Sequence, residues 1–118
     1  MPIAEPQQLD QAFHALADSN RRAIVARLTH GAASVSELAA PLNVSLPTVL
    51  QHLDVLQRSG LVRSEKVGRV RTCRLEAGPM RAVEHWIADH RAVWERRLDL
   101  LGDVLDDAFA DHEGTSQQ

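Results

Sequence analysis

The chain has 118 residues, of which 44% are hydrophobic and 25% are charged. This length and composition favour one folded domain and argue against a disordered chain or a two-domain enzyme. The single cysteine excludes an internal disulfide. No apolar run reaches the roughly 18 residues of a membrane-spanning helix, and the first residues lack the pattern of a signal peptide. We therefore expect a cytoplasmic protein with no membrane contact.

Charge is distributed unevenly along the chain. Residues 19–75 carry nine basic and three acidic side chains, whereas residues 76–118 carry four basic and ten acidic ones. This asymmetry favours a basic surface that faces phosphates and an acidic end held away from them. Solvated helix faces would give the same counts, so charge alone leaves both interpretations open.

Apolar periodicity and capping residues predict the first elements in chain order. Helices are expected at residues 8–17, 19–29, 37–42 and 46–58. The expected N-caps of the second, third and fourth helices are Asp18, Ser36 and Ser45. A short strand is expected at residues 33–35, and Asn43 makes the turn before the fourth helix.

The periodicity changes after residue 60. Residues 61–67 and 70–75 alternate as strands do, and Gly68-Arg69 between them predicts a β-hairpin with a basic tip. Gly78-Pro79 is expected to break the chain again. From residue 80 to about residue 112 there is no proline and one glycine, which predicts a single long helix.

The long helix carries an apolar seam. Over much of its length, large apolar side chains recur at alternating spacings of three and four residues. The members of this seam are Ile87, Trp94, Leu98, Leu101 and Leu105. This spacing is typical of helices that pack on another helix. A chain of this size has no second helix long enough to cover the seam, so the sequence predicts a symmetric homodimer. Leu9 and Phe13 of the first helix are expected to join the interface.

The order of the elements defines a fold class. Helices, a tight turn, another helix, a basic hairpin and a long helix form a winged helix-turn-helix, which is mostly α with a small β-hairpin. We interpret residues 1–113 as one such domain, with dimerisation helices at about 5–18 and 80–112. Residues 114–118 are expected to form a flexible tail.

The candidate binding residues lie on the helix at 46–58 and on the hairpin. The projecting face of this helix offers Ser45, Thr48, Gln51 and His52. For His52, capping or packing within the fold is the alternative to a contact with phosphate or base. An amide can pair with adenine in the major groove, and hydroxyls or free N–H groups at a helix start can bond bases or phosphates. The basic residues expected to contact the DNA backbone or minor groove from the wing are Lys66, Arg69 and Arg71. These patterns predict binding to double-stranded DNA.

Four segments between about residues 9 and 76 carry a resemblance to a known family. They are residues 13–24 (FHALADSNRRAI), 35–39 (VSELA), 49–56 with 59–62 (VLQHLDVL and SGLV), and 68–71 (GRVR). In this order and spacing the chain resembles the ArsR family of dimeric winged-helix transcriptional repressors. The resemblance implies a dimer that binds a palindromic operator and blocks polymerase.

The chain departs from the family pattern in two respects. The short helix lacks the cysteine pair of metal-responsive members, and the spacings of another family metal site are absent after Met80, so we expect no metal or cofactor. In the helix at 46–58, Leu46 and Leu50 stand where polar residues are usual. These leucines indicate either apolar contact with thymine methyls or a repacked helix.

Two groups in the long helix have a functional and a plain interpretation. His85 with Asp89, and Asp111 with His112 and Glu113, could bind a metal across a dimer. A solvated acidic helix explains the same residues.

Three further residues could respond to a small-molecule or redox inducer. Cys73 is either a redox-sensitive thiol near arginines or a small half-buried strand residue. Trp86 and Trp94 either line a ligand pocket or pack in the core or seam. The identity of any small-molecule or redox inducer stays open.

The patterns favour a sequence-specific DNA-binding regulator over two other classes. The alternative is a winged-helix module that binds proteins and not DNA, in which case the basic hairpin would be indifferent to phosphates. An enzyme is not expected, because the sequence offers no nucleophile with a base at usable spacing and no glycine-rich phosphate loop.

Overall fold

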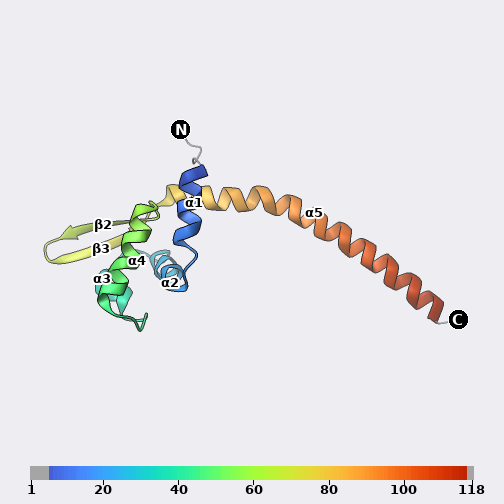
Figure 1. The fold of residues 1–118 in the computed structure, drawn as a ribbon, viewed down its shortest axis with the longest axis horizontal. Helices are drawn as coiled ribbons and strands as arrows, with labels where there is room; N and C mark the ends of the chain where they lie inside the picture. Colours follow the sequence, from blue (N-terminus) through green and yellow to red (C-terminus); the bar gives the residue numbers. More distant parts are fainter. Residues whose placement is uncertain (1–5, 117–118) are drawn as a thin grey trace. The chain divides into compact units, whose positions relative to one another are not determined.

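The structure is a computed structural model that describes residues 6–116 of the chain, with side chains for residues 7–110. Its elements in chain order are α1 (Pro6–Ala15), α2 (Ser19–Leu28), β1 (Ala33–Ser34), α3 (Val35–Ala39), α4 (Leu46–Arg58), β2 (Val62–Val67), β3 (Val70–Leu75) and α5 (Ala77–Ser116) (Figure 1). The contacts divide the chain after Glu84 into two units, which are described separately. The mostly α class with a winged helix-turn-helix is confirmed.

Two of the three expected N-caps are confirmed. The Asp18 carboxylate accepts hydrogen bonds from the backbone N–H groups of Asn20, at 2.9 Å, and Arg21, at 3.1 Å, and so caps α2. The Ser45 hydroxyl accepts from the Thr48 backbone N–H and caps α4. These caps satisfy backbone donors that have no partner within the helix.

The expected cap and bounds of the short helix are wrong. Ser34, and not Ser36, caps α3, which begins at Val35 and ends at Ala39. The Glu37 backbone N–H donates to the Ser34 hydroxyl and the Ser34 backbone N–H donates to the Glu37 carboxylate, each at 3.1 Å. This reciprocal capping box fixes the helix start two residues earlier than expected, because β1 is only two residues long and ends at Ser34.

The hairpin forms as predicted and gains a third strand. The antiparallel sheet has the order β1-β3-β2, with Val67 opposite Val70 at the tip and Ala33 opposite Cys73 at the inner edge. Gly68 has a φ of 64° in the tip turn, a conformation that glycine adopts without strain. The pairing of β1 with β3 ties the helical part of the chain to the base of the hairpin.

The core lies between α2, α3, α4 and the inner end of the sheet. Its largest fully buried side chains are Ile24, Leu38, Val49, Leu53, Leu56, Leu61 and Cys73. Val49, Leu53 and Leu56 lie at helical spacing on one face of α4. That face is therefore committed to packing, and the opposite face of α4 stays outside.

The long helix begins earlier and ends later than expected. Gly78 and Pro79 lie in the first turn of α5 and do not break the chain, because proline is tolerated where the backbone N–H needs no helical partner. Val83 is buried and anchors this start in the core. The helix continues to Ser116 through residues expected to form a tail, of which 117–118 lie outside the described part. None of the helices in the described residues is long and apolar enough to cross a membrane.

Candidate nucleic-acid interface

The outward face of α4 carries two leucines and an amide. Leu46 is 52% exposed and Leu50 is 42% exposed, and Gln51 is exposed beside them. Leu46 and Leu50 are one helical turn apart and so share a face. This placement contradicts the repacked-helix interpretation, because neither leucine belongs to the core.

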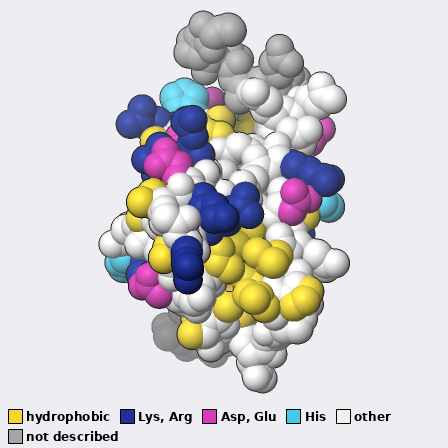
Figure 2. Space-filling view, turned by 90° about the vertical axis from the view of Figure 1, so that its left-hand side faces the viewer, with side chains coloured by type: hydrophobic (Ala, Val, Ile, Leu, Met, Phe, Trp, Pro, Cys, Tyr) yellow, Lys and Arg dark blue, Asp and Glu magenta, His cyan; other side chains and the backbone are white. Residues whose placement is uncertain are grey.

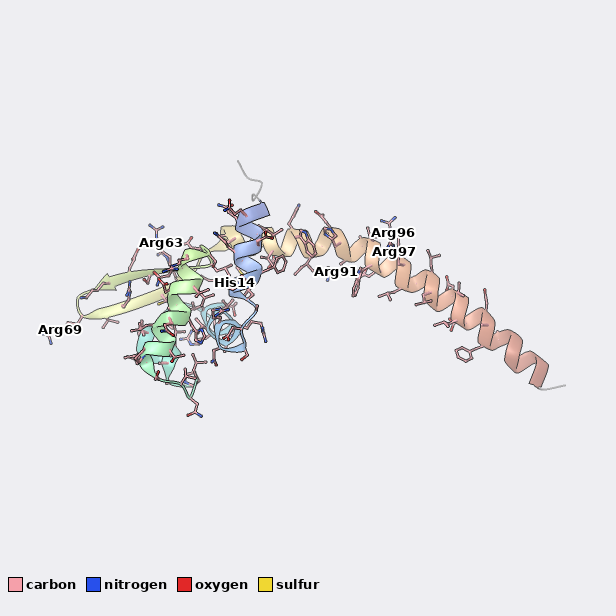
Figure 3. The ribbon with its side chains drawn as sticks, in the orientation of Figure 1. His14, Arg63, Arg69, Arg91, Arg96 and Arg97 are labelled. Atoms are coloured by element: carbon pink, nitrogen blue, oxygen red, sulfur yellow. The ribbon has the colours of Figure 1, made fainter. Side chains whose placement is uncertain are left out.

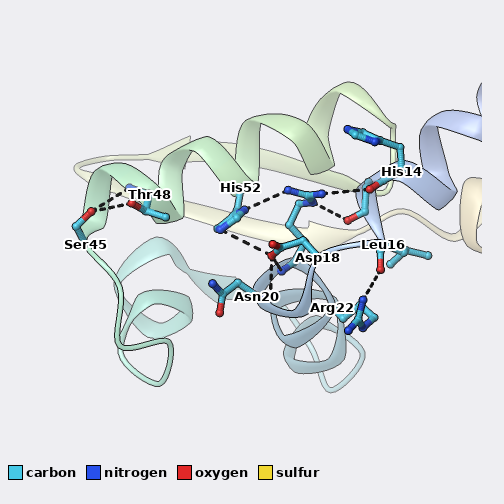
Figure 4. Close-up of polar contacts among 10 residues, drawn as sticks. His14, Leu16, Asp18, Asn20, Arg22, Ser45, Thr48 and His52 are labelled. Atoms are coloured by element: carbon cyan, nitrogen blue, oxygen red, sulfur yellow. Dashed lines mark hydrogen bonds and ion pairs between the residues drawn. The ribbon is translucent and has the colours of Figure 1, made fainter.

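The start of α4 presents hydroxyl groups and backbone donors. The Ser45 and Thr48 hydroxyl oxygens lie 2.9 Å apart (Figure 4). Ser45 is exposed, whereas Thr48 is half-buried. The first turn of a helix carries partial positive charge and free N–H groups, so this end of α4 suits a phosphate.

His52 lies deeper than the other predicted site residues. Its side chain is only 14% exposed, with Nε2 at 3.8 Å from the Asp18 carboxylate and Nδ1 at 3.4 Å from the Arg21 guanidinium. Figure 4 shows these contacts between the middle of α4 and the α1–α2 turn. The structure therefore brings His52 together with the cap of α2, a contact that the sequence analysis missed.

Arg21 joins three elements, and its role was also missed. Its Nε donates to the carbonyl of Ala15 at 2.7 Å, and another guanidinium nitrogen donates to the carbonyl of His14 at 3.2 Å. Both carbonyls lie in the last turn of α1, and that of His14 also accepts from the Ala17 backbone N–H at 3.1 Å. One arginine thus caps α1 and contacts His52, which fixes α4 against the first two helices. The segment 13–24 contains Asp18 and Arg21, but only the tertiary fold brings His52 to them.

The hydrogen bonds at Asp18 also change its acidity. The backbone N–H of Arg21 is the main cause that lowers the pKa of the Asp18 carboxyl, and the nearby His52 lowers it further. The carboxylate form is the one that caps α2, so the cap depends on ionisation of Asp18.

The hairpin places two cations where nothing neutralises them. Lys66 and Arg69 are exposed, and within the described part of the chain neither pairs with an acid. Arg69 lies at the tip of the hairpin and points away from it (Figure 3). Figure 2 views the molecule from the side of the hairpin, and lysine and arginine side chains gather there beside hydrophobic ones. Basic side chains gathered on one surface are typical of proteins that bind nucleic acids.

Arg71 has a second role at the base of the wing. Its Nε donates to the Ser64 hydroxyl at 3.1 Å, and that hydroxyl donates to the Gln57 side-chain oxygen at 3.0 Å. The chain of contacts connects β3 through β2 to α4. The wing is therefore fastened to α4, and these hydrogen bonds orient Arg71.

A small hollow of about 230 Å³ separates α4 from the wing. Its lining residues are Leu50, Leu53, Asp54, Gln57, Arg71 and Cys73. Cys73 is fully buried rather than half-buried. Burial raises the pKa of the Cys73 thiol, and the opposing effect of Arg71 is smaller. The premise of an arginine-activated thiol is therefore wrong for this fold.

The predicted dimer seam is exposed in α5. Among its members, Trp94 is 67% exposed, Leu98 55% and Leu101 54%, and Ile87 and Leu105 are also exposed. In α1, Phe13 lies at the surface, whereas Leu9 packs against the core. The ring of Trp86 stacks on His90 at 4.0 Å between ring centroids. Outward-facing apolar residues over several turns of a helix are typical of a protein–protein interaction surface.

The candidate metal ligands are not gathered in the described residues. No group of three or more histidine, cysteine, aspartate or glutamate side chains lies close enough to hold a metal ion within residues 7–110. His85 and Asp89 are both exposed on α5. The side chains of Asp111, His112 and Glu113 lie outside the described residues.

Known proteins share this arrangement. A family model described as a helix-turn-helix domain matches residues 16–65. The HTH-type transcriptional regulator Rv2034 of Mycobacterium tuberculosis is 41% identical over 97 residues, which cover 82% of this chain and 88% of that protein. The crystal structure of an ArsR family transcriptional regulator is 47% identical, with a TM-score of 0.71, over 79% of this chain and 96% of that one. A homodimeric winged helix-turn-helix DNA-binding domain from Mycobacterium bovis is 27% identical, with a TM-score of 0.58, over 79% of this chain and 83% of that one.

Fold, site and relatives define the class of DNA-binding helix-turn-helix transcriptional regulators. Within that class, the chain belongs to the ArsR family of winged helix-turn-helix regulators. The alternative of a protein-binding module without DNA binding finds no support in these relatives.

Proposed function

We propose that the chain is a dimeric transcriptional repressor that inserts α4 into the major groove of a palindromic operator. The observation that carries this proposal is the exposed surface of α4, where Leu46, Leu50 and Gln51 adjoin a wing whose two outermost cations have no acidic partner among the described residues. Base-edge contacts select the sequence, and phosphate contacts supply affinity and orientation. Repression follows because a dimer on the operator occupies the site that polymerase needs.

The assembly joins two chains through α1 and the seam of α5. The homodimeric state of the similar Mycobacterium bovis domain supports it. In such dimers, recognition helices about 34–36 Å apart meet successive major grooves on one side of the duplex. A signal that changes the angle between the two chains changes this spacing and releases the DNA. We also expect the protein in the cytoplasm, where the operator is.

Replacing Gln51 by alanine tests base reading. The amide can make two hydrogen bonds to adenine, and such a pair discriminates by about 1–3 kcal/mol. Gln51→Ala is expected to weaken binding to the preferred operator by about tenfold, with a much smaller change on random duplex. Fluorescence anisotropy on both duplexes measures the difference. His30→Ala, which shortens an exposed polar side chain after α2, is the control. Equal loss on both duplexes would remove Gln51 from base recognition.

Replacing Arg69 by alanine tests phosphate contact. A lost phosphate contact weakens all duplexes and lowers the slope of log K against log salt by about 1 per chain. Arg69→Ala is therefore expected to weaken operator and random duplex alike, with a slope lower by about 2 for the dimer. Arg96→Ala, the same change on the acidic helix α5, is expected to leave the slope unchanged. An unchanged slope with Arg69→Ala would show that the wing tip does not contact phosphate.

A further inference from the structure

We infer that α4 recognises the 5-methyl groups of thymines through Leu46 and Leu50, so that each operator half-site contains thymines at fixed positions. This inference rests on the proposed function and adds the chemical group by which the operator is selected. It makes the two leucines specificity-determining residues.

The exposure of both leucines is the first observation. Leu46 and Leu50 are about half exposed and flank the buried face of α4 that Val49, Leu53 and Leu56 form. Each leaves apolar surface in water that only a partner can cover. Neither leucine belongs to α1 or to the apolar seam of α5, the two elements that join the proposed dimer. In the proposed function, the molecule that contacts this part of α4 is the operator DNA.

The surroundings of Leu50 indicate the chemistry of that partner. Leu50 and Arg71 line the same hollow between α4 and the wing, and the hydroxyl-bearing start of α4 lies one turn from Leu50. Asp54, which also borders the hollow, is paired with Arg58 at 3.0 Å, so its charge is compensated. An apolar face beside cationic groups fits a surface that carries phosphates and a few apolar groups.

The major groove offers one apolar group at base edges. Adenine, guanine and cytosine present hydrogen-bonding groups there, whereas thymine adds a C5 methyl. A leucine makes no hydrogen bond and leaves a polar base edge unsatisfied, so it favours thymine over the other bases. Gln51, next to Leu50, can pair with a neighbouring adenine. The expected half-site therefore combines thymine with adenine.

The geometry of the helix sets the spacing. Residues one turn apart, such as Leu46 and Leu50, are separated by about 6 Å along the axis of α4. Successive bases of one strand are about 3.4 Å apart. If α4 lies along the groove, the two thymines are about two base pairs apart.

The test removes the methyl and nothing else. Each thymine of the selected operator is replaced in turn by deoxyuridine, in both half-sites together, and binding of the full chain is measured by anisotropy. Loss of one buried methyl is expected to weaken binding about fourfold, and loss of the symmetric pair about fifteenfold. We expect this effect at one or two thymines per half-site.

Protein variants assign the effect to a residue. With Leu50→Ala or Leu46→Ala, one of the sensitive positions is expected to bind thymine and deoxyuridine equally. Val67→Ala, which shortens an exposed apolar side chain on the wing, is the control and is expected to keep the full sensitivity.

The outcomes separate this inference from the proposed function. If the operator is bound but no deoxyuridine position weakens binding, the inference is overturned while the DNA-binding role stands. If sensitivity persists in both leucine variants, another residue reads the methyl and the inference is likewise overturned. If no duplex is bound above the random level, the proposed function fails and the inference fails with it.

Discussion

Replacing Leu98 and Leu101 of α5 by aspartate is expected to turn the dimer into a monomer and to weaken operator binding by about 100-fold or more. Both leucines are more than half exposed in the single chain, so the substitutions place charge in the interface and spare the core. A monomer engages one half-site and loses the gain from joining two binding events. Sedimentation equilibrium measures the assembly, and anisotropy on the operator measures the affinity.

The control for this variant is Arg96→Asp. In the spacing of the seam, position 96 lies on the opposite side of α5, and Arg96 is exposed. The control adds an aspartate to the same helix, so it tests the effect of helix propensity. It changes the charge at one site by more than either leucine substitution does, so it also tests the effect of net charge. It is expected to remain dimeric and to bind the operator. A seam variant that still sediments as a dimer would contradict the proposed assembly.

Replacing Asp18 by alanine is expected to lower the free energy of unfolding by about 1–2 kcal/mol at neutral pH, the usual cost of a lost N-cap. The variant loses the acceptor for two backbone N–H groups of α2 and the acid that faces His52 on α4. We therefore expect a lower stability and a weaker operator affinity, because α4 is less firmly held. Urea unfolding measures the first and anisotropy the second.

The effect of Asp18 depends on pH in a defined direction. Hydrogen bonding lowers the pKa of Asp18 in the folded chain below its ordinary value of 3.8. Its contribution to stability is therefore fully present above that value and is lost as the pH falls through the lowered pKa. The difference between wild type and Asp18→Ala should be constant from pH 7 to about pH 5 and shrink toward pH 3. Asp18→Asn keeps a cap without the charge, so its stability should lie between those of Asp18→Ala and wild type at pH 7 and should not fall with the ionisation of this position.

A result without pH dependence would change this account. If Asp18→Ala and wild type unfold with the same difference at pH 7 and pH 3, the charge of Asp18 contributes nothing. Asp54→Ala, which removes an exposed ion pair on α4, serves as the comparison and is expected to change stability by less than about 1 kcal/mol.

Local sequence patterns predicted the elements on which the site depends. Asp18 and Ser45 are short polar residues directly before apolar-periodic stretches, and such residues cap helices through contacts within three positions. Gly68-Arg69 between two alternating runs predicted the hairpin for the same local reason. The outward orientation of Gln51 followed from the helical period, since Val49, Leu53 and Leu56 define the buried face.

Features that depend on distant contacts could not be predicted in this way. The N-cap of α3 is Ser34 because β1 pairs with β3, about forty residues away in sequence, and ends at this residue. The contacts of His52 with Asp18 and Arg21 bridge more than thirty positions. Burial of Cys73 likewise depends on that strand pairing, and it reverses the effect expected from neighbouring arginines.

Selection of binding sites from a random duplex library, with the full purified chain and no added metal, shows whether the chain reads a palindrome as a dimer. We expect enrichment of a dyad-symmetric site with half-sites centred about one helical turn, or 34–36 Å, apart. We further expect a steep fall of affinity with salt on the enriched site. Enrichment of a single asymmetric half-site, or no enrichment at all, would contradict a dimeric regulator that reads a palindrome through α4.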